Sequence, residues 1–428
     1  MNIMKRRVVV TGLGTVNPVG NDVENSWKNI CNGYNGISYI TAFDASDYKI
    51  KFSAEVKEFE PENRLVKRDI KHMDRFTQLA LYAAEEAIQN SGILESVDEV
   101  YKQSDIGVII SSGIGGLGTI EKEHYRGIRR SFEKIDPYFV PKVICNIAAA
   151  RIAITHGFQG ACYSPIAACA GGSYAIGEAF RMIRDGYEDA IVCGGAESAI
   201  TEMGIGGFCS LGALTNTDDV DGASIPFDAK RSGFVMGEGA GILVLEELEH
   251  AKSRNAPIIV EIVGYGINCD AYHITSPMLD GSGAALCMEM ALKDAKITAS
   301  DIDYINAHGT STQLNDSSET NAIKRVFGEN AYNVSISSTK SMTGHLLGGS
   351  GGVEAVFSCL AIRDNFVPPT INLKDRDVSC DLDYTPNVGK NKNVDYVLSN
   401  SLGFGGHNAS LIFKKYDSLF ENKSDCKE

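Results

Sequence analysis

Three residues of this sequence could carry acyl-transfer chemistry, and the first is Cys169. It stands in Ser164-Pro-Ile-Ala-Ala-Cys-Ala-Gly-Gly-Ser173, where an apolar stretch gives way to small residues and then to a helical pattern. Unpaired N–H groups at a helix N-terminus favour a thiolate and lower a thiol pKa. The glycines would admit an acyl substrate and leave N–H groups free to hold an oxyanion. The segment predicts a nucleophile; a helix cap with an incidental buried cysteine is the alternative.

The other two residues are His308 and His345, which both follow predicted strands. His308 lies in Asn-Ala-His-Gly-Thr-Ser-Thr, directly after a strand, where α/β proteins keep ligand-binding residues. His345 comes after a second strand and a hydroxyl-rich turn that contains Lys340. A lone histidine is more often a hydrogen-bonding residue than a catalyst, and Lys340 could be a solvated charge. Because both histidines and the cysteine share the same kind of position beside glycine, the pattern favours one common site.

Two further glycine-rich turns admit more than one interpretation. The turn Ser399-Asn-Ser-Leu-Gly-Phe-Gly-Gly-His-Asn408 could aim backbone donors at a substrate or be a plain hairpin. The turn Gly113-Ile-Gly-Gly-Leu-Gly118 fits a dinucleotide-binding pattern. The charged segment after it lacks the strand and the acidic residue that such a site requires. We therefore expect close backbone packing there, at a subunit contact, in place of a nucleotide site.

Short β-branched runs alternate with helical patterns along the chain, which predicts an α/β fold with strands covered on both faces. Predicted strands in the first part are 7–11, 106–111, 190–193 and 241–246, and a helix is predicted over 73–91. The order restarts near residue 258, with predicted strands at 260–263, 302–306, 334–337, 396–399 and 409–413. We therefore expect a duplicated architecture: one half over 1–257 with the cysteine, another over 258–415 with the histidines, and a polar tail over 416–428.

The composition excludes several classes of function. With 428 residues, 43% hydrophobic and 22% charged, the chain is typical of a globular protein larger than one domain. No apolar run is long enough for membrane insertion, and the start is too short and glycine-broken for a signal peptide, so we expect a cytoplasmic protein. The net charge of −15 argues against nucleic acid as a partner. None of the 11 cysteines forms a Cys-x-x-Cys pair, so reduced thiols and no metal are expected.

Taken together, the segment around Cys169, Asn306-Ala-His-Gly-Thr-Ser-Thr312, Ser338-Thr-Lys-Ser-Met-Thr-Gly-His345 and Gly403-Phe-Gly-Gly-His-Asn408 resemble the β-ketoacyl-acyl-carrier-protein synthases. The elongating synthase II is the nearest type, and the similarity covers nearly the whole chain. The resemblance implies a thiolase-like fold of two similar halves in a layered α-β-α-β-α arrangement, and usually a homodimer. It implies no organic cofactor and no metal.

The resemblance also implies a role for each residue of the site. Cys169 would hold an acyl chain as a thioester, and a carbanion from decarboxylated malonyl carrier protein would attack it. His308 and His345 would stabilise the enolate through their N–H groups. Lys340 would orient this pair and bias its charge. Phe404 would supply its N–H to the oxyanion hole and act as a gate.

The resemblance implies roles for further residues as well. Ile114 and Phe208 would line the acyl tunnel, and Thr310 and Thr312 would contact the phosphopantetheine arm. The acidic residues that would support the site, with structural ion pairing as the alternative, are Asp316, Glu319 and Glu354.

The acyl carrier protein is acidic, so its docking requires a local basic patch. Candidates are Lys67, Arg68, Lys71 and Lys134. Gly212 stands where some relatives have an arginine, which implies a weaker or differently shaped docking surface. The nucleophile segment reads Ala-Ala-Cys where Thr-Ala-Cys is commoner, which removes one hydroxyl and leaves the mechanism intact.

Three other functions are alternatives to this one. A condensing enzyme of a specialised lipid or polyketide pathway would need no change in the site. A non-catalytic chain-length-factor subunit would lack the cysteine, which is present here. A pure acyl-binding protein would not need Lys340 and a second histidine.

Overall fold

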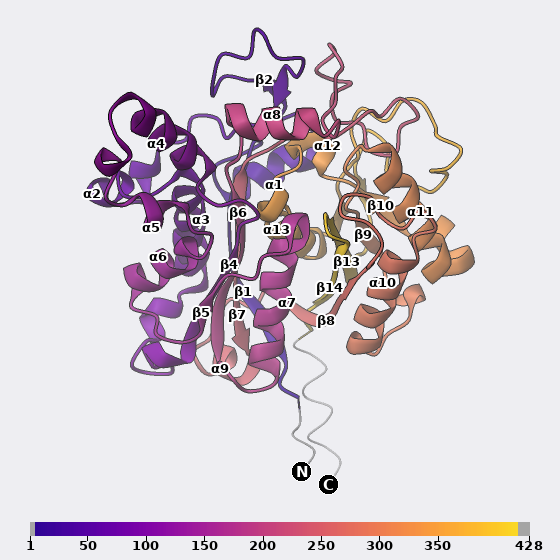
Figure 1. Ribbon diagram of the computed structural model, residues 1–428. Coiled ribbons are helices and arrows are strands. Elements are labelled where there is room, and N and C mark those ends of the chain that lie inside the picture. The colour runs from indigo at the N-terminus through magenta and orange to yellow at the C-terminus, as the bar shows by residue number, and fades with distance from the viewer. Residues whose placement is uncertain (1–4, 418–428) are drawn as a thin grey trace.

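One ten-stranded sheet organises the chain in the computed structural model, which describes residues 5–417 (Figure 1). Five of its strands come from the first part of the chain: β1 (Val8–Val16), β4 (Ile106–Ser111), β5 (Cys162–Tyr163), β6 (Ala190–Glu197) and β7 (Gly239–Glu247). The other five are β8 (Val260–Cys269), β9 (Tyr304–Asn306), β10 (Ser335–Ser337), β13 (Tyr396–Gly403) and β14 (His407–Lys415).

The two sets of strands have the same topology. In the first set the order is β5-β4-β6-β7-β1, and in the second it is β10-β9-β13-β14-β8. Each set has parallel pairing between its first three strands and antiparallel pairing between the rest. The sets join through β1 and β8, where residues 8–10 pair with residues 260–262. The exact boundary at residue 258 stays a prediction, and most of the predicted polar tail lies outside the described residues.

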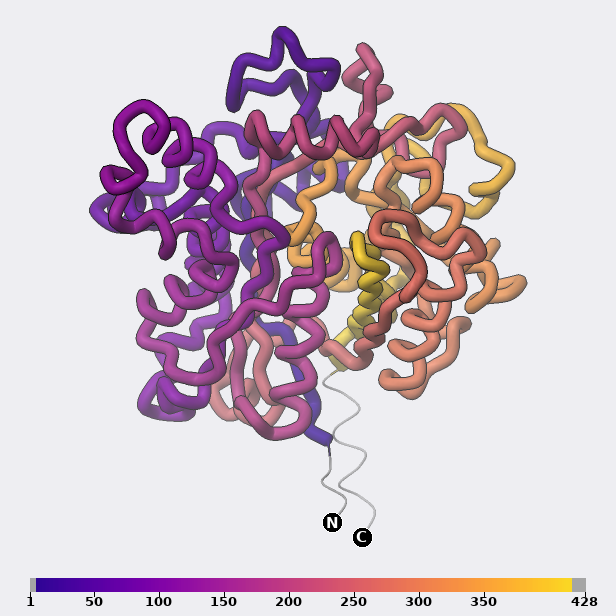
Figure 2. Tube along the Cα trace, in the orientation of Figure 1, coloured from indigo at the N-terminus to yellow at the C-terminus, as the bar shows by residue number. Residues whose placement is uncertain are grey.

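Helices form three layers around these strands (Figure 1). On one side α3 (Arg75–Ser91) and α6 (Ile147–His156) cover the first set. On the other side α10 (Ser282–Ala295) and α11 (Gln313–Phe327) cover the second set. Between the two sets lie α7 (Gly171–Arg184) and α13 (Ser350–Asp364). This is the α-β-α-β-α arrangement that was expected, and Figure 2 shows the two parts of the chain side by side.

The remaining elements complete the fold. The helices are α1 (Val23–Cys31), α2 (Lys67–Ile70), α4 (Leu117–Arg129), α5 (Phe139–Val143), α8 (Glu202–Ser210), α9 (Leu248–Ser253) and α12 (Lys340–Thr343). Two small strand pairs are β2 (Ser38–Tyr39) with β3 (Phe52–Ser53), and β11 (Phe366–Val367) with β12 (Lys390–Asn391). Within residues 5–417, no helix combines the length and apolar character that crossing a membrane requires.

The sequence explains where α3 begins and why the central helices touch. Asp74 accepts the N–H of Phe76, so it caps the helix and the predicted start at residue 73 moves to residue 75. At the centre, a Cβ on Gly172 would lie 2.7 Å from the backbone nitrogen of Gly352. Glycine at this contact lets α7 and α13 pack backbone against backbone.

The glycine turn at residues 113–118 connects β4 directly to α4. A Cβ on Gly115 or Gly116 would lie 2.5 Å from a backbone oxygen of Val143 or Lys142. The close backbone packing expected of this turn is therefore present, and it lies within the chain, against α5.

Candidate active site

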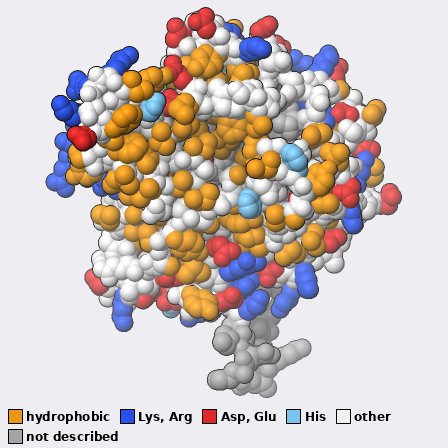
Figure 3. All heavy atoms as spheres, in the orientation of Figure 1, with side chains coloured by type: hydrophobic (Ala, Val, Ile, Leu, Met, Phe, Trp, Pro, Cys, Tyr) orange, Lys and Arg blue, Asp and Glu red, His pale blue; other side chains and the backbone are white. Residues whose placement is uncertain are grey.

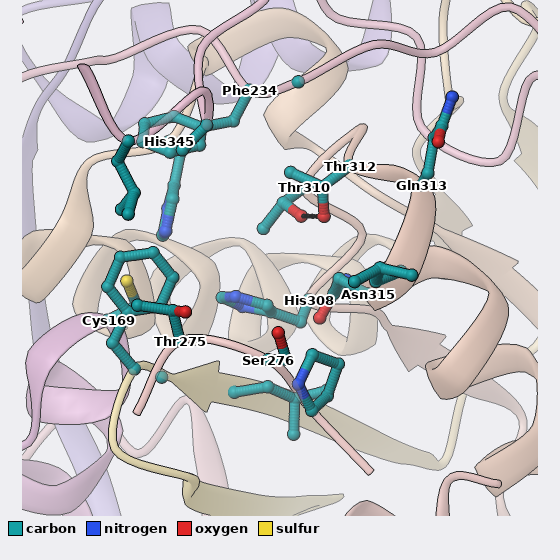
Figure 4. Close-up of a pocket in the computed structure, with 18 of the residues that line it drawn as sticks. Cys169, Phe234, Thr275, Ser276, His308, Thr310, Thr312, Gln313, Asn315 and His345 are labelled. Atoms are coloured by element: carbon teal, nitrogen blue, oxygen red, sulfur yellow. Dashed lines mark hydrogen bonds between the residues drawn. The ribbon is translucent and has the colours of Figure 1, made fainter. Parts of the chain in front are cut away.

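Four turns at the ends of strands bring the candidate residues together. His308 follows β9, His345 follows β10 and α12, and Phe404 follows β13. These three strands are parallel, so their carboxyl ends lie at one edge of the sheet. Cys169 lies between β5 and α7, in the short turn Ala168–Ala170. Figure 4 shows both imidazole rings directed toward the space beside the Cys169 sulfur.

These turns enclose a cavity of about 400 Å³. It is lined by seven of the predicted residues: Cys169, Phe208, His308, Thr310, Thr312, His345 and Phe404. Gly212 also lies on the wall. A space of this size, with a thiol and two imidazoles on its wall, suits a substrate with both an apolar chain and a carbonyl group.

The backbone around Cys169 is strained. Ala168 has φ of +46°, and Leu347, which precedes α13 in the second half, has φ of +48°. Left-handed backbone at such residues costs on the order of 1–3 kcal/mol and is held only by surrounding packing. Both halves thus make the same sharp turn into their central helix, and in the first half that turn presents a thiol.

Cys169 is a neutral thiol in this environment. Burial raises its pKa to about 12, although the charge of Lys340 and the N–H groups of Phe404 and of Cys169 itself act to lower it. The sequence predicted a lowered pKa at this helix N-terminus, and that prediction is wrong because the loss of solvent outweighs the favourable groups. Deprotonation therefore requires a base in the cavity.

His308 is held by its backbone. Glu319 accepts the N–H of His308 at 2.9 Å and that of Gly309 at 2.8 Å. Burial, then the charge of Lys340, then His345 lower the pKa of His308 well below its usual value. The imidazole is therefore neutral near pH 7, and its Nδ1 is buried without a hydrogen-bond partner in the described part of the chain.

His345 is also neutral and lies against aromatic rings. Burial and the charge of Lys340 lower its pKa well below the usual value. Its ring centroid is 5.2 Å from that of Phe234 and 5.2 Å from that of His308, in edge-on geometries. Its Nδ1 lies 2.9 Å from the hydroxyl of Ser350. Two neutral imidazoles that share one space can each donate one N–H to a single oxygen.

Lys340 lies behind the histidines and not on the cavity wall. It is 1% exposed, so the alternative of a solvated surface charge is wrong. Its ammonium group is paired with Glu354, which is 2% exposed. Burial raises the pKa of Glu354 to about 7, against the lowering effect of Lys340. The lysine thus supplies a fixed positive charge that disfavours protonation of both imidazoles.

Glycine places Phe404 beside the sulfur. A Cβ on Gly403 would lie 2.9 Å from the oxygen of Ala167 and 3.2 Å from the nitrogen of Cys169. The end of β13 can therefore approach the turn before α7, and the Phe404 N–H reaches the thiol. The Phe404 ring lies 6.2 Å from that of Phe208, centroid to centroid.

The other predicted residues lie outside the cavity wall. Ile114 packs in the hydrophobic cluster that contains Cys169. Asp316 accepts the N–H of Phe227 and lies 3.6 Å from Arg231, which is a structural ion pair.

The predicted docking residues lie on the surface. Lys67, Arg68 and Lys71 are exposed on and after α2, and Lys134 is exposed after α4. Lys67 pairs with Glu62 and Arg68 with Asp69.

Sequence reasoning missed three residues. Glu197 is fully buried and accepts the N–H groups of Gly113, Ile114 and Gly348, so it ties both halves together. Phe234 and Ser350 contact His345, as described above. Each stands alone in a glycine-rich segment without a motif of its own, so no local pattern signals its role.

The site residues fit no metal centre: within residues 5–417, no three His, Cys, Asp or Glu side chains are grouped so that they could hold an ion.

Comparison with known proteins identifies the relatives of this chain. "Beta-ketoacyl synthase, N-terminal domain" matches residues 5–251, and "Beta-ketoacyl synthase, C-terminal domain" matches residues 259–374. The chain belongs to the β-ketoacyl synthase family. Within this family, the 3-oxoacyl-[acyl-carrier-protein] synthase 2 of Synechocystis sp. is 49% identical over 97% of this chain and 99% of that protein. The synthase 2 of Staphylococcus aureus is 47% identical over 96% of this chain and 99% of that protein.

Solved structures of β-ketoacyl synthases share the fold. A β-ketoacyl synthase from Burkholderia phymatum is 34% identical, with a TM-score of 0.89 over 96% of this chain and 100% of that chain. A type II polyketide ketosynthase, solved with its acyl carrier protein, is 36% identical. Its TM-score is 0.89 over 96% of this chain and 100% of that chain. The thiolase-like fold expected from the sequence is therefore confirmed.

Proposed function

We propose that this chain is a β-ketoacyl-acyl-carrier-protein synthase II. It would condense an acyl chain held on Cys169 with malonyl carrier protein, giving β-ketoacyl carrier protein and CO₂ in fatty-acid elongation. The observation that carries the proposal is the single cavity lined by a thiol and two neutral imidazoles. The high identity to synthase 2 relatives favours fatty-acid elongation over a specialised pathway.

In the first half-reaction, the Cys169 sulfur attacks the thioester carbonyl of the acyl carrier protein. The N–H groups of Cys169 and Phe404 would stabilise the oxyanion, since both lie beside the sulfur, next to the place where the attacked carbonyl must come. The thiol proton passes to a neutral imidazole and then to the departing carrier thiolate. One C–S bond forms and another breaks, so the products are acyl-Cys169 and free carrier thiol.

In the second half-reaction, malonyl carrier protein loses its carboxylate as CO₂. The electron pair of the broken C–C bond enters the thioester enolate, whose oxygen accepts N–H bonds from His308 and His345. The enolate carbon then attacks acyl-Cys169, a C–C bond forms, and the Cys169 thiolate leaves and takes up one proton from solvent. Burial lowers the pKa of both histidines, and the charge of Lys340 lowers it further, so Lys340 supports this step by favouring neutral N–H donors.

The carrier protein is the partner this chemistry requires. Thr310 and Thr312 are hydrogen-bonded to each other at 2.9 Å on the cavity wall, where the phosphopantetheine arm would enter. The exposed cations Lys67, Arg68 and Lys71 would receive the acidic carrier protein.

A second copy of the chain would cover the edge of the sheet, and we infer a cytoplasmic homodimer. The edge strand β5 is exposed, and an unpaired edge readily joins another strand. Around it, Val140, Ile154, Tyr163 and Ile166 expose 60%, 71%, 37% and 59% of their surfaces. Figure 3 shows hydrophobic side chains gathered over this part of the molecule. Sedimentation equilibrium tests the dimer; a monomer at micromolar concentration would refute it.

Acylation tests the function directly. Incubation of the full chain with acyl carrier protein should give a mass adduct on Cys169, and added malonyl carrier protein should release β-ketoacyl carrier protein. Cys169→Ala should remove both products. Cys209→Ala is the matched control, because Cys209 packs in the same hydrophobic cluster. Failure of the unmodified chain to form an adduct would refute the proposal.

A further inference from the structure

Ser350, the first residue of α13, is hydrogen-bonded through its hydroxyl to the imidazole of His345. Its hydroxyl lies 2.9 Å from His345 Nδ1 and accepts the backbone N–H of Leu346 at 2.9 Å. Ser350 is 2% exposed, so water does not compete for these contacts. Neither the sequence motifs nor the mechanism above assigns it a role.

The second contact of Ser350 helps to assign the direction of its hydrogen bond to His345. The Leu346 N–H already donates to Oγ, and the hydroxyl has one proton of its own to give. Within the described residues, the acceptor beside it is His345 Nδ1. We assign the hydroxyl as the donor to Nδ1, because this arrangement uses its one proton; Nδ1 then carries no proton, and the proton of the neutral ring lies on Nε2.

The rest of His345 is fixed by contacts that do not distinguish its two ring nitrogens. The backbone N–H of His345 donates to the Val235 carbonyl at 2.7 Å, and the His345 carbonyl accepts the backbone N–H of Gly237 at 2.9 Å. The Phe234 ring packs against the imidazole. A half-turn of the ring would exchange Nδ1 for a carbon and leave these contacts in place, so the hydroxyl of Ser350 decides the orientation.

We propose that Ser350 is a positioning residue that holds His345 as the Nε2–H tautomer, with this N–H directed at the enolate oxygen. This inference rests on the proposed condensation. It also separates the two histidines, because the Nδ1 of His308 has no hydrogen-bond partner within residues 5–417. His345 is then held as a hydrogen-bond donor through Nε2, whereas His308 can carry its proton on either ring nitrogen.

The tautomer is measured by NMR on the full chain with ¹⁵N-labelled histidine. The protein has 8 histidines, and the His345→Gln variant identifies the resonances of His345. We expect Nδ1 at the position of an unprotonated, hydrogen-bonded nitrogen and Nε2 at that of a protonated one. A protonated Nδ1 in the unmodified protein would overturn the inference.

Three variants connect the tautomer to the reaction. Ser350→Ala should slow malonyl decarboxylation about tenfold, since a buried acceptor loses its partner, and should move the Nδ1 resonance. Acylation of Cys169 should be unchanged. Ser350→Thr keeps a hydroxyl, so it should restore both the rate of malonyl decarboxylation and the position of the Nδ1 resonance. Ser358→Ala is the matched control, because this buried hydroxyl on the same helix donates to the Glu354 carbonyl at 2.7 Å and not to a histidine.

The results separate this inference from the proposed function. Absence of decarboxylation in the unmodified chain would refute the function, while the tautomer could still be read from the spectrum. Normal decarboxylation in Ser350→Ala, with an unmoved Nδ1 resonance, would refute the role of Ser350 alone. An equal loss in Ser358→Ala would show that any hydroxyl on α13 serves the fold, which would also overturn the inference.

Discussion

The Lys340→Met substitution separates the contribution of the buried ion pair to stability from its contribution to chemistry. Methionine fills a similar volume without charge, so the change isolates electrostatics. It leaves Glu354 buried without its cation and beside Glu319, whose charge also raises the pKa of Glu354. The pKa of Glu354, about 7 in the unmodified protein, must therefore rise further.

The size of the effect follows from linkage. Above pH 7 the folded variant binds a proton that the folded parent protein has released, while the two unfolded chains behave alike. The stability of the variant relative to the parent therefore falls as pH rises, by about 1.4 kcal/mol per pH unit. At pH 9 the difference is about 2.7 kcal/mol, near the low end of the values seen when one partner of a buried pair is removed. Below pH 7 this difference disappears.

Urea unfolding at pH 6 and at pH 9, at one protein concentration, measures the difference. The double variant Lys340→Met with Glu354→Leu is the control, because it removes both charges and should lose the pH dependence. Both variants should condense more slowly, since the histidines keep their burial but lose the nearby positive charge that also disfavours their protonation. A variant that is equally destabilised at both pH values would refute the electrostatic account. Full condensation activity in the double variant would refute the role of Lys340.

Three further predictions concern other parts of the site. Gly403→Ala should move the Phe404 N–H away from the sulfur and slow acylation about 100-fold, as single-turnover mass spectrometry can measure; an unchanged rate would remove Phe404 from the oxyanion hole. His308→Ala should abolish malonyl decarboxylation, followed as CO₂ release, and leave acylation largely intact; loss of acylation alone would contradict its assigned role. Arg68→Glu with Lys71→Glu should raise KM for carrier-protein substrates but not for a pantetheine thioester, and equal effects on both would argue against docking there.

The sequence predicted most of the architecture because its signals are local. The strand at residues 106–111 agrees with β4, and each of the other predicted strands overlaps an observed one. The repeated strand order was visible as well, since it needs only the periodicity of each segment. The junction of β1 with β8 was not predicted, because pairing between distant strands has no local signature.

In the site, the residue types were readable but their environments were not. The glycine-flanked Cys169, His308 and His345 could be found from their motifs. The raised pKa of Cys169 and the burial of Lys340 depend on how completely the surrounding layers exclude water. Glu197 and Ser350 act through contacts across the fold. A single acidic or hydroxyl side chain between glycines gives no indication of such partners.

The glycine contact between α7 and α13 determines which parts of this enzyme can be altered separately. Cys169 lies in the short turn directly before α7, and Ser350 is the first residue of α13. Gly172 packs directly against Gly352, so two backbones set the spacing between Cys169 and Ser350, the residue that contacts His345. Mobile side chains do not enter this contact. Substitutions at the cavity wall, such as Phe208, can therefore change the accepted substrate and leave the reacting groups in register. Chain-length engineering belongs on that wall, and the helix contact should be left untouched.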